Sequence, residues 1–324
     1  MRRFILTIAL ILTILNIPVF GMLGEVIVTG GAEQTLCTKV SEDLTSVLDG
    51  IEAGDIEPVR SMFSANGFEM LSDILLKAPL NNASSIHKQP LLKLKKGGYE
   101  IRNIRVKRIS DEGMSGNRYQ NLVFTLDNKG KIISVRFAME NKYYQQILED
   151  GERLKDFEFR QEILEFIEIF RTAYNRKDIG FLRKVYSDNA LIIVGRVLKA
   201  APDRPDQNEM LKNSFLSKEK IEFVRKSKAE YISALEKNFI RNAFLNVVFD
   251  SVGVIRHDSL HSIYGVTLKQ RWSSSTYSDT GWVFLMIDFQ DEDEPLIHVR
   301  TWQPDKFSDG SVLGMWDFEV IPKK

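Results

Sequence analysis

A pattern of twelve residues occurs twice in this chain, at positions 55–66 and again at 178–189. Both copies read Asp-Ile, two variable positions, an aliphatic residue, Arg, a variable position, an apolar residue, an aromatic residue, Ser, a variable position and Asn. The separation between the copies is the length of a small domain. The pattern therefore predicts a tandem duplication of one folding unit.

A second landmark supports the duplication. Residues 133–136 read Ile-Ser-Val-Arg, and residues 297–300 read Ile-His-Val-Arg. The second copy has more residues between its two landmarks, and the Pro-containing polar segment 201–208 holds part of this insertion. If the alignment is extended, 132–138 stands where 296–302 does, without the Trp, His and acidic residues of the second copy. Any functional site is therefore expected in the second copy.

Length and charge limit the classes of protein that this chain can belong to. A chain of 324 residues is long enough for two domains with separate cores. Lys and Arg together number 44, and so do Asp and Glu, so no overall basic field exists to hold nucleic acid or anionic lipid. An apolar fraction of 44% places the chain in the globular class rather than the disordered one.

The N-terminus has the order of a secretory signal. Two arginines precede the apolar run 4–15, and Pro18 and Gly21 follow it. The run is shorter than the roughly 20 residues of a membrane-spanning helix, although an uncleaved anchor is an alternative. We expect residues 1–22 to be a signal peptide and the protein to be periplasmic or secreted, with membrane contact through this segment alone. Cys37 is the sole cysteine, so it is predicted to be a buried free thiol.

Each copy begins with helix signals. Apolar residues recur at helical spacing in 40–51 and in 159–174, and the charged residues between the apolar positions of the second segment are expected to face water. Asp55 and Asp178 are suitable N-caps for a short helix that follows in each copy. A further helix is expected at 217–239.

Strand signals follow the helices in each copy. Helices first and an antiparallel meander last is an α+β arrangement, in which the helices cover one face of a curved sheet. The expected domains are 35–150 and 155–324, divided near Asp150 and Gly151. The expected strands are 99–109, 119–126 and 132–138 in the first domain, and 246–256, 262–273, 281–289 and 296–303 in the second.

This order of elements resembles the nuclear transport factor 2-like, or SnoaL-like, family with its cystatin-like cone. The residues that carry the resemblance are Tyr174, Asp178, Tyr186, Ser187, Asp188 and Asn189 in the second copy and Asp55, Phe63, Ser64 and Asn66 in the first. The resemblance covers residues 35–320. It implies two tandem cone-shaped domains of an exported bacterial protein, the first one degenerate. The family includes isomerases, cyclases, dehydratases and units that only bind, so the resemblance does not select an activity.

The last two strands hold the candidate site. Alternation places Val283, Leu285, Ile287 and Phe289 on an apolar face that should pack on the helices. The opposite face is expected to gather two tryptophans, an acid, an imidazole and a guanidinium, provided that the connecting loop keeps the two strands in phase. The candidate ligand- or interface-binding residues are therefore Trp282, Asp288, His298, Arg300 and Trp302.

Several uses of this face remain open. It can be an interface with the other repeat or with a second subunit in a homodimer, a ligand site, or an ordinary half-exposed sheet face. By the family resemblance, Asp288 would be a proton-abstracting base while Arg300 or His298 steadies an enolate. Against this, the base of the resembling enzymes looks into the cone, and an Asp–Arg pair across strands is more often structural.

No metal or cofactor site is predicted. His257 and His261 have the i, i+4 spacing of a helical metal site, but 256–262 has the composition of a turn. The acidic segment 291–294 lacks the spaced oxygens and Gly of a calcium loop, and the lysines of 93–96 lack interleaved aromatics. We therefore expect an exported, non-catalytic protein that binds a protein partner or a small apolar ligand, with a SnoaL-like isomerase or lyase as the alternative.

Overall fold

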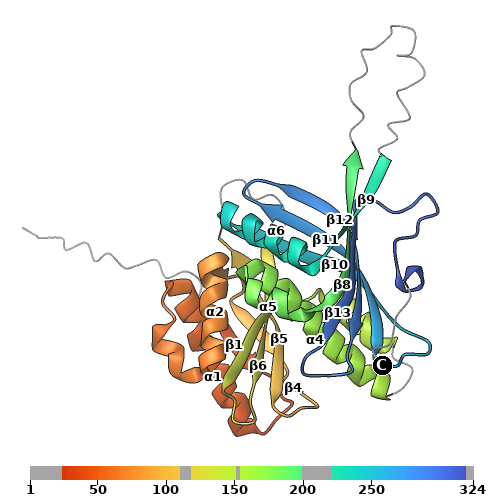
Figure 1. The fold of residues 1–324 in the computed structure, drawn as a ribbon. Coiled ribbons are helices and arrows are strands. Elements are labelled where there is room, and N and C mark those ends of the chain that lie inside the picture. Colours follow the sequence, from red (N-terminus) through yellow and green to blue (C-terminus); the bar gives the residue numbers. More distant parts are fainter. Residues whose placement is uncertain (1–23, 110–117, 151–153, 199–219, 319–324) are drawn as a thin grey trace, which may run out of the picture.

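The computed structural model describes residues 24–109, 118–150, 154–198 and 220–318. Figure 1 shows helices packed against two sheets, with helix α4 (Leu154–Arg176) between them. The predicted signal segment 1–22 and the loop 201–208 lie outside the described residues. Within those residues, no helix has both the length and the apolar character needed to cross a membrane.

The first copy forms a unit with helical segments and a small antiparallel sheet in the order β2-β5-β6-β7, with β4 also paired to β5. A separate parallel pair, β1 with β3, lies beside it. The elements are β1 (Glu25–Val28), α1 (Gln34–Ala53), η1 (Glu57–Met62), α2 (Ala65–Lys77), β2 (Leu80–Asn82), β3 (Ile86–Gln89), β4 (Leu92–Lys93), β5 (Tyr99–Arg108), β6 (Tyr119–Leu126), β7 (Ile132–Phe137) and α3 (Asn141–Glu149).

The second copy forms a larger unit around a six-stranded sheet in the order β10-β11-β12-β13-β8-β9. All pairs are antiparallel except β13 with β8. The helix expected at 217–239 is shorter than predicted, because strand β9 precedes it and Ser227 caps its start through a reciprocal bond with Glu230. Besides α4, the elements are α5 (Ile179–Val185), β8 (Tyr186–Leu198), β9 (Lys220–Lys226), α6 (Lys228–Arg241), β10 (Leu245–Arg256), β11 (Ile263–Ser274), β12 (Ser278–Asp288), β13 (Leu296–Gln303) and η2 (Met315–Asp317).

The repeated pattern occupies equivalent places in the two units. In each copy, the aromatic residue of the pattern pairs in parallel with a residue of the last strand of the meander. Phe63 pairs with Ile132, and Tyr186 pairs with Ile297. One residue later, each last strand has a β-bulge, at Ile133 and at His298. A shared pairing followed by a shared bulge supports the duplication, and both units have the predicted α+β arrangement.

This equivalence corrects the alignment of the second landmark by one residue. Since Ile132 rather than Ile133 occupies the place of Ile297, Val135 corresponds to Arg300 and Phe137 corresponds to Trp302. The first unit therefore keeps an aromatic residue where the second has Trp302.

Two hydrophobic cores divide the chain near residue 138. The first core is built from residues between Val26 and Phe137, and the second begins at Met139 and includes Tyr144 and Ile147 around helix α3. Helix α3 thus packs with the second unit although it follows the sheet of the first.

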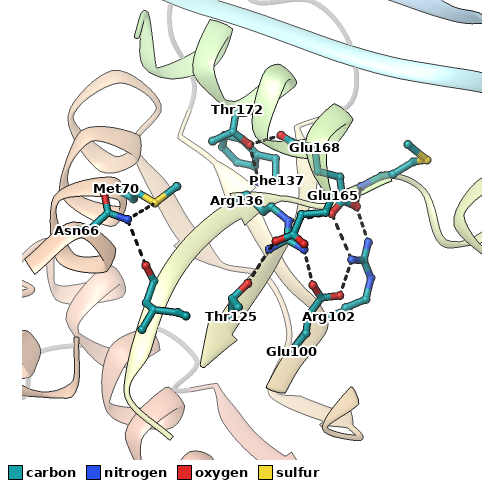
Figure 2. A network of polar contacts seen from close by, with 12 residues as sticks. Asn66, Met70, Glu100, Arg102, Thr125, Arg136, Phe137, Glu165, Glu168 and Thr172 are labelled. Carbon is teal, nitrogen blue, oxygen red and sulfur yellow. Dashed lines mark hydrogen bonds and ion pairs between the residues drawn. The ribbon is translucent and has the colours of Figure 1, made fainter. Parts of the chain in front are cut away.

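A buried ionic network joins the two units (Figure 2). Glu168 of α4 accepts hydrogen bonds from Arg102 and Arg136, which lie on β5 and β7 of the first unit, and Glu100 of β5 binds both arginines as well. Arg136 also donates to Thr125 Oγ1 at 2.7 Å. These four charged side chains are at most 5% exposed. Two positive and two negative charges therefore compensate one another inside the protein.

The network changes the interpretation of helix α4. Its charged residues were expected to face water, but Glu168, Arg171 and Arg160 are buried. The side of α4 that carries Glu168 and Arg171 is covered by β5, β6 and β7 of the first unit.

Candidate ligand-binding site

A groove with a volume of about 410 Å³ runs along α4 and α5. We call it the α4–α5 groove. Its walls come from three regions: the turn 94–96 of the first unit, the facing sides of α4 and α5, and the β12–β13 connection 289–296. Its volume lies within the range of small-molecule sites in proteins.

The floor of the groove is apolar. Phe166, Val185 and Phe289 are buried members of the second core. Several neighbouring apolar side chains are half-buried and keep part of their surface open: Leu94, Ile169, Phe181, Pro295 and Leu296. Apolar surface that converges in a concavity is favourable for a hydrophobic ligand, because binding removes it from water.

Charged residues form the rim of the groove. Lys95 lies 3.3 Å from Glu158, Lys96 lies 2.9 Å from Asp293, and Lys184 lies 2.7 Å from Glu294, each measured from Nζ to the nearest carboxylate oxygen. The lining residues also include Glu162, Glu165 and Glu292. Six acidic residues against three lysines make the rim net negative.

Glu162 is an acidic lining residue of the groove whose carboxylate is buried. Both of its carboxylate oxygens are buried and have no hydrogen-bond partner among the described residues, although Lys95 Nζ lies 3.8 Å from Oε1. Burial and the nearby charge of Glu292 raise the pKa of Glu162, while Lys95 opposes the rise. A ligand that donates a hydrogen bond or carries a positive charge would satisfy this carboxylate.

The five predicted site residues do not share one face. Arg300 pairs with Leu285, and Trp302 pairs with Val283, so both side chains point to the helix-covered side of the sheet. The prediction that they lie on the outer face was wrong. The bulge at His298 adds one residue to β13, which reverses the side on which the following side chains lie.

The other three predicted residues stay on the outer side or the edge. His298 Nε2 lies 3.7 Å from Asp288 Oδ2, so these two side chains do meet. Trp282 lies apart from them, with Lys306 Nζ 4.7 Å from the centre of its ring. Asp288 and Arg300 are on opposite faces, so of the two partners considered for Asp288 in the enzymatic alternative only His298 lies near it.

Arg300 and Trp302 belong to a buried polar cluster inside the second unit. The guanidinium carbon of Arg300 lies 5.1 Å from the ring centre of Tyr231, whose hydroxyl is 2.7 Å from that of Tyr174. The hydroxyl of Tyr186 lies 3.4 Å from the hydroxyl of Tyr174. Burial raises the pKa of both Tyr186 and Tyr231 well above the ordinary value, so these phenols stay neutral.

Comparison with known proteins adds a likeness of fold. No model of a protein family matches the sequence, and no curated protein does. Similar solved structures include Bd1075 of Bdellovibrio bacteriovorus, which is 12% identical with a TM-score of 0.33 and matches over 67% of this chain and 76% of that one.

Two further solved structures are also similar to this chain. An NTF-2 like protein of unknown function from Shewanella oneidensis is 14% identical, with a TM-score of 0.29 over 44% of this chain and 96% of its own. ActVI-ORFA of Streptomyces coelicolor is 12% identical, with a TM-score of 0.31 over 45% and 97%. The structural neighbours of this chain thus include proteins of the family that the sequence resembles, and likeness at this level carries no argument about activity.

The described residues include no group of three or more His, Cys, Asp or Glu side chains placed to hold a metal ion. The α4–α5 groove was not predicted from the sequence. Its apolar floor was assigned to the core, and its rim comes from segments far apart in the chain. The lysines of 93–96 and the acids of 291–294 were noted separately, but only the fold brings them together.

Proposed function

We propose that this protein is an exported, non-catalytic binding protein, and that it holds a small, largely apolar ligand with an amine or another hydrogen-bond donor in the α4–α5 groove. The observation that carries the proposal is the combination, in one concavity, of half-exposed apolar side chains with the buried carboxylate of Glu162. The net negative rim favours a cation over an anion.

The proposal is tested with a matched pair of probes, 3-phenylpropylamine and 3-phenylpropionate, titrated into the full-length protein by isothermal calorimetry. The amine is expected to bind more tightly. Glu162→Gln is expected to weaken amine binding by about tenfold, since a hydrogen bond to a charged group contributes about 1.5–3 kcal/mol. Glu69→Gln, an exposed substitution on α2, is the control.

A second variant tests the apolar part. Phe181→Ala removes half-exposed apolar surface from the groove and should weaken both probes alike. Equal affinity of the wild type for the amine and the carboxylate, or amine binding unaffected by Glu162→Gln, would overturn the proposed ligand chemistry. Binding of neither probe would leave a protein partner as the better candidate for this groove.

Export is a separate part of the proposal and has its own test. The charged and apolar order of residues 1–22 supports it. When the chain is produced in a Gram-negative host, we expect it in the periplasmic fraction or the medium, with a mass that lacks about the first 22 residues. A cytoplasmic product with its N-terminus intact would contradict this part alone.

A further inference from the structure

A second, larger concavity lies between the two units. It has a volume of about 690 Å³, and we call it the inter-unit cleft. One wall is formed by 119–121 and Arg105 on the sheet of the first unit, and the other by residues of β10, β11 and the start of β12. The segment 138–140 and Arg171 of α4 complete the lining.

Within the described part of the chain, Arg171 is a buried cation without a carboxylate partner. It is 5% exposed, and among the described residues it forms hydrogen bonds to neutral oxygens and no ion pair with a carboxylate. Its recorded partners are neutral oxygens: Val247 O at 3.0 Å, Ala138 O at 2.8 Å and the amide oxygen of Gln120. A guanidinium has five N–H donors, so two of them remain for a further acceptor.

The electrostatics of Arg171 agree with this geometry. Burial lowers its pKa to about 10, and Arg271 and Arg108 add to the decrease, while Glu168 opposes it. The group is still charged at neutral pH, and a buried charge that lacks an opposite charge is costly. In the ionic network of Figure 2, by contrast, each arginine has carboxylate partners.

The rest of the cleft also favours an anion. Arg105 and Arg271 stand at its walls, and Arg271 shares its charge with Asp250, 3.1 Å away. The indole nitrogen of Trp272 is a buried donor without a partner among the described residues. Hydroxyl groups line the cleft at Ser273, Ser278 and Thr280.

Two acidic side chains line the cleft. Glu140 lies 3.3 Å from Lys142 and is thus partly compensated. Asp279 accepts a hydrogen bond from the hydroxyl of Tyr277 at 2.7 Å, and its other oxygen is buried without a partner among the described residues. Burial raises the pKa of Asp279, while the hydrogen bond from Tyr277 and the charge of Arg300 oppose the rise.

We propose that the inter-unit cleft is a binding site for a small oxyanion, the carboxylate or phosphate group of a polar metabolite, held by Arg171 at the floor and by Arg105 and Arg271 at the walls. This site is distinct from the α4–α5 groove and does not depend on it. The two concavities share no lining residue.

The test is calorimetric titration of the full-length protein with inorganic phosphate and with succinate, in a buffer of low ionic strength without chloride. Arg271→Gln and Arg105→Gln, both at exposed positions, are each expected to weaken binding about tenfold. Lys107→Gln is the matched control, because Lys107 is an exposed cation on the same strand as Arg105 but does not line the cleft.

Arg171→Lys keeps the charge and removes the planar fork, and it should weaken binding more than either wall variant, with circular dichroism to confirm that it is folded. Binding of only one probe identifies the group that the site selects and supports the proposal. Failure of both probes to bind at roughly 10 mM, or affinities in Arg271→Gln and Arg105→Gln equal to that of Lys107→Gln, would overturn it.

Discussion

Arg136 of β7 and Glu168 of α4 form an ion pair across the boundary between the two units, with Arg136 Nε 3.0 Å from Glu168 Oε2. Their side chains are 0% and 1% exposed. Each unit therefore supplies the counter-charge for a side chain of the other, and this part of the contact between the units is buried like a core.

Glu168→Gln is expected to lower the free energy of unfolding by about 3–5 kcal/mol. The buried arginines Arg136 and Arg102 would then share a single buried carboxylate, that of Glu100. Urea denaturation followed by circular dichroism measures this. Glu165→Gln is the control on the same helix, since Glu165 is 36% exposed and lies 3.6 Å from Arg136. Similar losses for both variants would show that the network adds nothing beyond a surface pair.

The network also predicts a dependence of stability on pH through Glu100. Burial alone would raise the pKa of Glu100, but Arg136 and Arg102 outweigh burial and hold it below the ordinary 4.5. The unfolded chain then takes up this proton at a higher pH than the folded protein does. The stabilisation is therefore present above about pH 4.5 and is lost as the pH falls through the lower folded-state value.

Unfolding free energies measured between about pH 6 and pH 3 should fall less steeply in Glu100→Gln than in the wild type, whatever the offset between the two curves. Parallel curves would contradict the assignment of this carboxylate as a source of acid sensitivity.

Gly281→Ala is expected to destabilise the protein by about 1–3 kcal/mol, because a Cβ there would lie 2.7 Å from Trp302 Cε2 and 2.6 Å from Gln303 O. The shift of the indole should change the tryptophan fluorescence. Gly253→Ala is the matched control, since it also lies in a strand and a Cβ there meets nothing within 4 Å. A Gly281→Ala protein with unchanged fluorescence and stability would show that Trp302 is not held against this strand.

The C-terminal segment packs on the outer face of the sheet. Met315 is buried with Phe284, Met286 and Val299, and the ring of Phe318 stacks on that of Phe284 at 5.8 Å. Removal of residues 311–324 should therefore lower the melting temperature by roughly 3–10 °C, as expected for the loss of a buried apolar side chain. Trp316→Ala, at a position that is 60% exposed, should leave the melting temperature nearly unchanged. Equal melting temperatures for the truncated chain and the wild type would mean that this segment does not pack on the sheet.

Patterns of side chains predicted the elements well but not the direction of every side chain. The apolar face of Val283, Leu285 and Ile287 packs on the helices as predicted. Arg300 and Trp302 lie on the side opposite to the predicted one, because the backbone bulge at His298 inserts one extra residue and reverses the alternation that follows. Neither alternation nor the number of loop residues reports such a bulge in advance.

The misplaced charges of α4 have a different cause. Glu168 and Arg171 follow the spacing of a solvent-exposed helix face, and nothing local distinguishes them from Glu165. Their burial follows from contact with β5, β6 and β7, which are distant in the sequence. The same limit hid both concavities, because the residues that line each of them come from two units.

The placement of Glu168 has a consequence for how these two copies can be separated. A cut between them would take Glu168 away from Arg102, take Glu165 and Glu168 away from Arg136, and turn the protected side of α4 toward water. Each half would then hold charges that have lost their partners from the other half. The two copies must therefore evolve together. A substitution of a charged residue in this network in one copy requires a compensating substitution in the other.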